Sequence, residues 1–379
     1  MRSPSDQAEI AAQIILLVRS GRATSRRMLS EVAHLSPTTA GMYVDQLITS
    51  GLLSESGLEQ GAMGRPKRLL TVQASAGWFA GVELNAERAQ AMAVDFSGQV
   101  KASKVVFLPR DPEVETVLPI LMDMVRAMKK TMTGAGPLLG IGIGAPGVVE
   151  PTRGVGVFYS FIRGWNEVAL DTHFRKAFHV PVTVENNLRV TALAERWHGD
   201  GRDLQDYVIL GPRSGFGVAM VQGGKLVTGA RFAAGEIGRW PWPLHAETSR
   251  QEVQVALSAP AIYRRLSRSK LSSAVPNDLH SAFTKLAGTT GPEWDEVVRD
   301  YGRLIGILHL LLDAEAYLLH GPLTALGKRF CEAVVQAAMS LCPAISKRSV
   351  RLEPSRLGDN AGALGAASLA MEAWSPAEI

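Results

Sequence analysis

The chain has 379 residues, 46% of them hydrophobic, which is enough for several packed domains. Its formal net charge of +4 is too small for a protein that coats nucleic acid, so any nucleic-acid contact must be local. The 2 cysteines, Cys331 and Cys342, exclude a disulfide framework and are expected to be small buried hydrophobes. Without a long apolar stretch or a signal peptide, we expect a cytoplasmic protein with no membrane partner.

Residues 1–76 have the pattern of a winged helix-turn-helix domain. Apolar residues between 24 and 53 recur at spacings that let two short helices share one core. Ser36 is a favourable N-cap and Pro37 suits the first helical position, which predicts that the start of the second helix enters a major groove. Gly64-Arg65-Pro66 follows as a stiff, extended tripeptide that suits a narrow minor groove.

Double-stranded operator DNA is the partner that this pattern predicts. The alternative is an ordinary helical packing unit, but a cluster of basic residues that includes Arg19 and Arg22 favours phosphate contacts. Two departures from a typical turn are His34, where glycine is usual, and Gly41, which costs roughly 1 kcal/mol inside a helix. The residues expected to contact DNA are Arg26, Arg27, Ser36, Thr38, Thr39, Met42, Arg65, Lys67 and Arg68.

The body of the chain, residues 77–379, begins with three predicted strands and then alternates helices with strands. The strands are expected at 78–85, 89–96 and 104–109. The helices are expected at 113–131, 167–178, 187–200, 258–268, 293–313, 324–341 and 359–372. This order, run through twice, predicts two α/β lobes with a cleft between them. Duplication of one half is suggested by the element order alone.

Three motifs occur along the body in a fixed order. They are LGIGIGAPG at residues 139–147, VENN at 184–187 and GEIG at 235–238. Together with the head and its Gly-Arg-Pro, they resemble the ROK family, which includes sugar-responsive repressors and sugar kinases. The resemblance covers nearly the whole chain and implies a two-lobed fold like that of actin and hexokinase, with sugar in the cleft and ATP between the lobes.

The residues that such kinases use for phosphoryl transfer are replaced here. Asn187 stands where kinase members carry the aspartate base, and an amide can bind a hydroxyl but cannot take its proton. An alternative is that Asn187 caps the following helix, and both roles can hold. The two phosphate loops are altered at residues 83–87 and 211–217, where a carboxylate, Pro212 and Phe216 stand in place of glycines and threonine. Near the adenosine site, a Gly-Gly pair is reduced to the run at residues 320–322. We therefore expect no catalytic residue, no cofactor and no enzyme activity.

The family's structural zinc is also not expected. Arg239 replaces the histidine ligand, and residues 240–254 contain no cysteine, so His245 alone cannot complete a zinc site. Packing of Trp240 and Trp242 is expected in its place. The expected ligand-binding residues are Asn186, Asn187, Glu236 and Arg239, with Gln254 matching a sugar-contacting glutamate of zinc-bearing relatives.

Amide and carboxylate groups suit sugar hydroxyls, and Arg239 suits the anion of a sugar phosphate or an acid sugar. The competing interpretation is that Glu236 and Arg239, three residues apart, pair with each other.

The predicted function is a transcriptional repressor of ROK type. Its inactive kinase-like body would form a homodimer, or a dimer of dimers, and sense a sugar or a sugar-derived effector. One alternative is an active ATP-dependent carbohydrate kinase with an appended DNA-binding head, which a coupled ADP-release assay would distinguish. Another is a body that serves only as a dimerisation scaffold.

Overall fold

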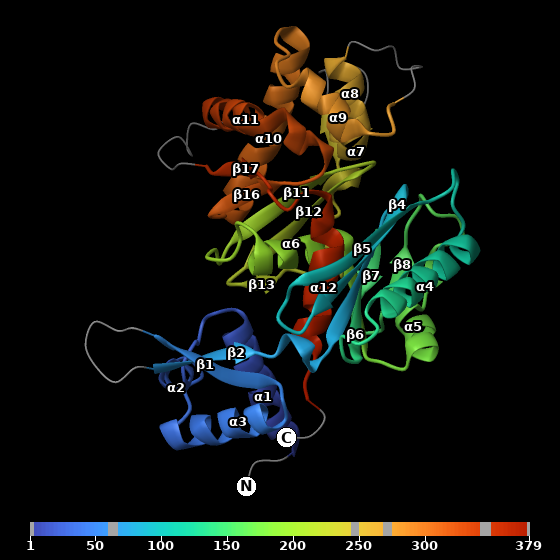
Figure 1. Ribbon diagram of the computed structural model, residues 1–379. Coiled ribbons are helices and arrows are strands. Elements are labelled where there is room, and N and C mark those ends of the chain that lie inside the picture. Colours follow the sequence, from blue (N-terminus) through green and yellow to red (C-terminus); the bar gives the residue numbers. More distant parts are fainter. Residues whose placement is uncertain (1–3, 60–66, 244–249, 268–274, 342–349, 377–379) are drawn as a thin grey trace.

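The computed structural model describes residues 4–59, 67–243, 250–267, 275–341 and 350–376. Arg65 and its flanking Gly64 and Pro66, which carry the predicted minor-groove contact, lie outside these ranges, as does Cys342. Within them, none of the helices has the length and apolar character needed to cross a bilayer. Figure 1 shows a small N-terminal head and a larger body made of two lobes.

The head consists of helices that pack with a short antiparallel hairpin. Its elements are α1 (Pro4–Arg19), α2 (Arg26–Val32), α3 (Pro37–Thr49), β1 (Leu53–Glu59) and β2 (Lys67–Val72). The Ser36 hydroxyl accepts a bond of 3.1 Å from the Thr39 amide, which caps α3 as expected. His34 has φ of +52°, which confirms the left-handed position predicted between α2 and α3.

The first lobe is built on a sheet with strand order β10-β6-β3-β4-β5. Its elements are β3 (Trp78–Leu84), β4 (Arg88–Asp95), β5 (Val100–Phe107), α4 (Val114–Thr131), β6 (Leu138–Ala145), α5 (Leu170–Phe178) and β10 (Val182–Asn186). Strands β3, β4 and β5 form an antiparallel meander, whereas β6 and β10 continue the sheet in parallel with β3. The three predicted strands and the first predicted helix are therefore confirmed.

Both faces of β3 are buried, and alternate residues pack on different helices. Trp78 and Val82 share a core with α4, while Phe79 shares one with the C-terminal helix α12 (Ala361–Ala373). A Cβ at Gly142 would lie 1.7 Å from the carbonyl oxygen of Ala366, so only glycine lets α12 lie this close to the sheet. This explains the glycine-rich sequence of β6.

The second lobe repeats the plan of the first. Its sheet has the order β13-β12-β11-β16-β17, again a meander of three strands extended by two parallel ones. The strands are β11 (Tyr207–Pro212), β12 (Phe216–Gln222), β13 (Lys225–Leu226), β16 (Ala316–Leu319) and β17 (Leu352–Pro354). The helices are α7 (Val253–Leu257), α8 (Ala259–Leu266), α9 (Leu279–Leu286), α10 (Pro292–Leu312) and α11 (Gly327–Leu341). The shared strand order agrees with a duplicated origin of the lobes.

Several element boundaries differ from the sequence-based expectation. The helix expected from residue 167 begins at Leu170, because β9 (Asn166–Val168) pairs with β8 (Val155–Phe158) in a small sheet completed by β7 (Val148–Glu150). Helices α7 and α9 were not expected. The helices expected from 324 and 359 begin as 3-10 turns, whose tighter winding precedes α11 and α12.

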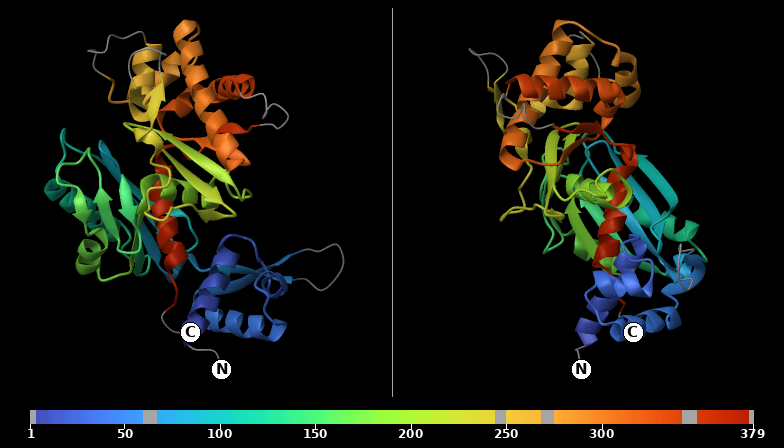
Figure 2. Two further views of the ribbon diagram at one scale, coloured as in Figure 1. Left: turned by 180° about the vertical axis from the view of Figure 1, so that it is seen from behind. Right: turned by 90° about the vertical axis from the view of Figure 1, so that its left-hand side faces the viewer.

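Helices α6 (Asn187–His198) and α12 lie against each other between the lobes, and α12 continues toward the head (Figures 1 and 2). The head and the first lobe share one hydrophobic core, in which Phe79, Phe96 and Trp374 stack together. Arg19 lies in this interface rather than at a DNA-facing surface, which corrects its expected place. Its Nε donates to the Phe96 carbonyl at 2.8 Å, and burial lowers the pKa of its guanidinium to about 10.

Candidate functional site

A cavity of about 260 Å³ lies in the body where the two lobes meet. Its wall is formed by the ends of β6 and β10, the start of α6, the β11–β12 turn and the 3-10 turn η2 (Ile237–Arg239). All four expected ligand-binding residues line it, namely Asn186, Asn187, Glu236 and Arg239. Gln254 lines it as well. We name this cavity the lobe-junction pocket. Its volume and the polar side chains set in its wall suit a single small polar ligand.

Asn186 lines the pocket but has mainly a structural role. Its Oδ1 accepts bonds from the amides of Leu188, at 2.9 Å, and Arg189, at 3.3 Å, and its Nδ2 donates to the Gly147 carbonyl at 2.8 Å. Asn186 is therefore the N-cap of α6. The alternative in which Asn187 caps this helix is wrong, because Asn187 is already the first helical residue.

Asn187 keeps its side-chain carbonyl available to a ligand. Its Nδ2 donates to the Leu84 carbonyl at 3.3 Å, and this bond ties α6 to the end of β3. An amide held in this way can accept a hydroxyl hydrogen but has no basicity near neutral pH. Asn187 therefore suits ligand binding and not proton abstraction.

A buried arginine on α6 positions the loop that carries Glu236. Arg189 donates to the Glu185 carboxylate at 2.6 Å and to the Phe232 carbonyl at 2.6 Å. Burial raises the pKa of Glu185, although Arg189 opposes the shift. Glu185 of the second motif thus pairs with Arg189, and Arg189 in turn holds the Phe232 carbonyl just before the third motif.

Glu236 and Arg239 face the same pocket, yet among the described residues no ion pair joins them. Arg239 instead lies over the ring of Phe158, with its guanidinium carbon 5.7 Å from the ring centre. Glu236 is open to solvent on one side, but the surrounding protein desolvates its carboxyl and raises its pKa, an effect that Arg189 and Arg239 oppose. The competing interpretation is therefore wrong as far as a direct ion pair is concerned, although the charge of Arg239 still acts on Glu236.

The sequence did not indicate Phe158 or Tyr159 as pocket residues, whereas Ser214 belongs to the segment 211–217 that it did single out. Phe158 and Tyr159 lie at the end of β8 and just beyond it, in the small sheet that was not expected, and burial raises the pKa of the Tyr159 hydroxyl. No motif or spacing marks them, so only the fold brings them to the pocket.

Comparison with known proteins identifies the family. The model of the ROK family matches residues 79–373. The chain belongs to the ROK family.

Among relatives, a xylose repressor of Caldicellulosiruptor bescii is 27% identical over 59% of this chain, and the match spans only 56% of that protein's length. The xylose repressor of Bacillus spizizenii is 23% identical over 92% of this chain and 91% of its own. A beta-glucoside kinase of Listeria monocytogenes is 37% identical over 26% of this chain and 34% of its own length.

Solved structures show the same fold. A ROK family transcriptional regulator, a homologue of the E. coli MLC protein, superposes with a TM-score of 0.79 at 20% identity, covering 98% of this chain and 97% of its own. A ROK family glucokinase from Streptomyces griseus, solved with glucose and AMPPNP, covers 78% of this chain and 99% of its own, with a TM-score of 0.63 at 22% identity. The two-lobed ROK body is therefore shared with both proteins.

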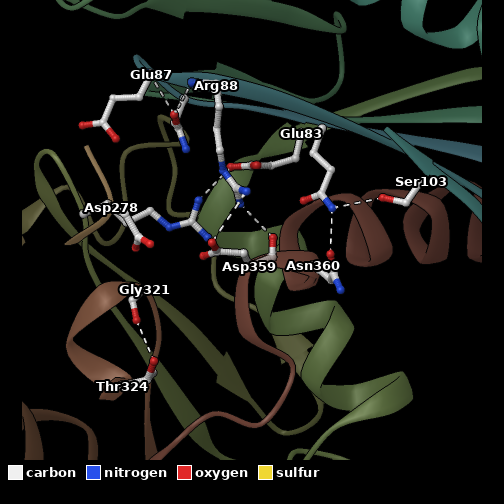
Figure 3. Close-up of polar contacts among 12 residues, drawn as sticks. Glu83, Glu87, Arg88, Ser103, Asp278, Gly321, Thr324, Asp359 and Asn360 are labelled. Atoms are coloured by element: carbon white, nitrogen blue, oxygen red, sulfur yellow. Dashed lines mark hydrogen bonds and ion pairs between the residues drawn. The ribbon is translucent and has the colours of Figure 1, made fainter. Parts of the chain in front are cut away.

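The other side of the lobe junction, toward the β3–β4 hairpin, contains polar groups that bond to one another (Figure 3). Arg213, from the β11–β12 turn, donates to the Glu83 carboxylate at 3.1 Å, and the side chains are 14% and 1% exposed. Arg88 donates to the Asp359 carbonyl at 2.9 Å. We name this region the hairpin side of the junction. Side-chain contacts within the chain join the lobes here, at the place where the ROK resemblance implies ATP.

A buried network lies behind the hairpin side. His320 Nε2 is 2.8 Å from Glu195 Oε1, and Ser355 donates to the same oxygen. Burial lowers the pKa of His320, although Glu195 opposes the shift. For Glu195, burial acts to raise the pKa, but hydrogen bonds from His320, Ser355 and the Asp200 amide outweigh it and lower the value. A neutral histidine therefore donates to an ionised carboxylate.

The region of the family's zinc is only partly described. Residues 244–249, which include His245, lie outside the described ranges, and within those ranges no three His, Cys, Asp or Glu side chains lie close enough to hold a metal. Trp242 is buried in the core of the second lobe, as expected, whereas Trp240 is largely exposed, contrary to expectation. Trp240 is the C-cap of the 3-10 turn η2 and lies outside β14 (Pro241–Pro243), of which Trp242 is the central residue.

In the head, α3 presents one face to the core and one to solvent. Ala40, Val44 and Leu47 are buried, whereas Thr38 and Met42 are exposed. Ser36 is exposed as well, and Thr39, which is partly buried, bonds to its hydroxyl. The exposed residues lie along one side of the N-terminal half of the helix, as predicted for a recognition helix.

The basic residues of the head differ in how far they are engaged. Arg26 donates to Asp45 and to Glu55, both at 2.7 Å, so its charge is already compensated. Arg27 is 77% exposed and pairs with Glu31 along α2. Arg68 is 72% exposed, with a carboxylate oxygen of Glu55 at 3.9 Å. The side chain of Lys67 and the whole of Arg65 are not among the parts of the chain that the structure describes.

Proposed function

We propose that this ROK protein is a transcriptional repressor. Its head is a winged helix-turn-helix that binds operator DNA, and its body binds a sugar-derived effector without transferring phosphate. The observation that carries the proposal is the exposed, uncharged N-terminal half of α3, capped by Ser36 and formed by Thr38, Thr39 and Met42. Hydroxyl and methyl groups at the start of such a helix read base edges in a major groove.

The exposed arginines support phosphate contacts beside that helix. Arg27 and Arg68 are exposed, and solvent weakens their ion pairs with Glu31 and Glu55. A DNA phosphate can therefore compete for both guanidinium groups. Arg26 bonds to two carboxylates across the head, which favours a role in holding α2 against α3. We keep Arg65 and Lys67 as proposed contacts of the hairpin tip with the minor groove and backbone.

The relatives support the same function. The Bacillus spizizenii xylose repressor aligns with 92% of this chain, which requires that the match include part of the head as well as the body. We propose on this basis that the effector is related to a monosaccharide and that the protein acts as a repressor.

The lobe junction supports a body that has lost phosphoryl transfer. Asn187 cannot serve as a base, and the Arg213–Glu83 pair fills the phosphate side with protein groups. Phosphoryl transfer depends on positioned phosphates, and a buried carboxylate next to the phosphate loop repels them. We therefore propose a pseudokinase body.

An apolar face on the second lobe has the character of a homodimer interface. Exposed apolar side chains line a groove of about 540 Å³ on this face: Ile307 and Leu311 of α10, Trp240 and Leu341. Exposed apolar patches of this kind are typical of interfaces, and a two-fold axis through this face would pair two heads for a symmetric operator. Leu311→Glu is expected to give a monomer in analytical ultracentrifugation, and an unchanged mass would reject this interface.

The shared core offers a route by which the body can act on the head. Effector binding at the lobe junction would shift the lobes, and α12 runs from that junction into the core beneath the head. A change in the angle of α12 would therefore move α3 relative to the second head of a dimer and change DNA affinity.

The test is selection of genomic fragments by the purified full chain, followed by gel shifts on the selected site. Met42→Ala and Thr38→Ala are expected to change the preferred sequence, whereas Arg68→Gln should weaken all sites alike. Thr49→Ala, exposed at the far end of α3, is the matched control and should bind as the wild type does. Selection of no preferred sequence would refute the proposed function.

A further inference from the structure

The wall of the lobe-junction pocket contains two guanidinium groups and one carboxylate: Arg213, Arg239 and Glu236. Arg213 is already engaged, because its Nη1 donates to Glu83 at 3.1 Å behind the pocket wall. Arg239 has no carboxylate partner among the described residues. Among the described residues, the pocket therefore holds one cation without a direct ion pair, and the nearest carboxyl that its charge acts on is that of Glu236 in the same wall.

Arg239 is exposed, but a ring of the first lobe gives its guanidinium a defined contact in the pocket wall. The residue ends the 3-10 turn η2, and its guanidinium lies on the Phe158 ring from the first lobe, 5.7 Å from the ring centre. Trp240 and Pro241 follow directly, and Pro241 restricts the backbone beyond the turn. A planar guanidinium held against an aromatic face keeps its N–H edges free to bind an oxyanion.

The rest of the pocket suits hydroxyl groups. Asn187 has an unengaged side-chain carbonyl, and the carboxyl of Glu236 accepts no hydrogen bond from the described residues. Both groups accept hydrogen bonds that sugar hydroxyls donate. A pocket that contains hydrogen-bond acceptors and a guanidinium group suits a ligand with hydroxyl donors and one anionic group.

We propose that the effector is an anionic monosaccharide derivative, whose carboxylate or phosphate binds Arg239 while its hydroxyls bind Asn187 and Glu236. This inference rests on the proposed function, because it assigns the chemistry of the effector in the same pocket. A neutral sugar would leave the Arg239 charge without a counter-ion, and Glu236 alone would repel a ligand that is anionic throughout.

The experiment is isothermal titration of the full chain with matched sets of ligands. Each set contains a neutral sugar, its aldonic acid and its terminal phosphate: D-xylose, D-xylonate and D-xylose 5-phosphate, and the same three forms of D-glucose. We expect an anionic member to bind about tenfold or more tightly than its neutral counterpart, the scale of one charge-assisted hydrogen bond. The better of the two anions distinguishes a carboxylate from a phosphate ligand.

Arg239→Gln should reduce binding of the anionic member about tenfold and leave the neutral sugar unchanged. The matched control is Arg231→Gln, which removes an exposed arginine from the same loop, outside the pocket wall, and should bind as the wild type does. Thermal melting without ligand shows whether each variant is folded.

Equal affinity for neutral and anionic members, unchanged binding in Arg239→Gln, or no heat with any member would each overturn the inference. Gel shifts on the selected operator, run with the same preparations, separate this failure from failure of the proposed function. DNA binding that persists without response to any anion rejects the ligand assignment alone, whereas loss of specific DNA binding rejects the regulator.

Discussion

The two sides of the lobe junction differ in how their polar groups are satisfied. On the hairpin side, Glu83 bonds to Arg213 and Arg88 bonds to Asp359, so these side chains find partners within the protein, although Glu83 Oε2 and Arg213 Nε form no hydrogen bond. In the lobe-junction pocket, Asn187, Glu236 and Arg239 face the cavity with hydrogen-bonding groups unused. The comparison shows that one region of a kinase-like body can become structural while its neighbour keeps the character of a binding site.

The first prediction would break the hairpin side. Glu83→Gln leaves the Arg213 guanidinium buried without a counter-charge, so the free energy of unfolding should fall by about 3–5 kcal/mol. Urea denaturation measures this change. Glu87→Gln, an exposed carboxylate in the same hairpin, is the control and should change stability by less than about 0.5 kcal/mol. Equal small effects of both substitutions would show that the pair contributes little.

The second prediction concerns pH and two desolvated histidines, His320 in the buried network and His198 at the end of α6. Burial lowers the pKa of His320 and of His198, the latter from 6.5 to about 4. The unfolded chain takes up protons on these rings below pH 6.5 and the folded protein does not. Stability should therefore fall between pH about 6.5 and 4, by about 1–3 kcal/mol. The lowered pKa of Glu195 acts in the same direction at lower pH.

Thermal melting as a function of pH measures this loss. His320→Gln should flatten the pH dependence, whereas His280→Gln, which removes an exposed histidine, should leave it as in the wild type. An unchanged slope in His320→Gln would contradict a neutral, buried His320.

The third prediction sharpens the contrast between the two sides. Asn187→Asp restores a carboxylate in the pocket but leaves the hairpin side closed, so no ATP turnover above the wild-type background is expected. A coupled ADP-release assay with a sugar panel measures it. Turnover by this variant would show that the hairpin side can still hold a nucleotide, and turnover by the wild type would favour the kinase alternative.

Local patterns in the sequence were reliable where the cause is local. Periodicity located most helices and strands, Ser36 and Pro37 marked the start of α3, and His34 was recognised as a turn residue. The order of three short motifs was sufficient for the ROK assignment, and their polar residues do line one pocket. Each of these inferences depends on residues a few positions apart, whose geometry the chain itself restricts.

Contacts between distant residues decided the rest. Arg19 was expected at a phosphate-contacting surface and is buried against Phe96, 77 positions away. The segment 83–87 was recognised as unfavourable for a triphosphate, but Arg213, the partner of Glu83, lies 130 positions further along the chain. Asn186 could be identified as a pocket residue, yet its bond to Gly147 makes it a structural one. A sequence shows which groups can form hydrogen bonds, whereas only the packed lobes determine which are already bonded and which remain for a ligand.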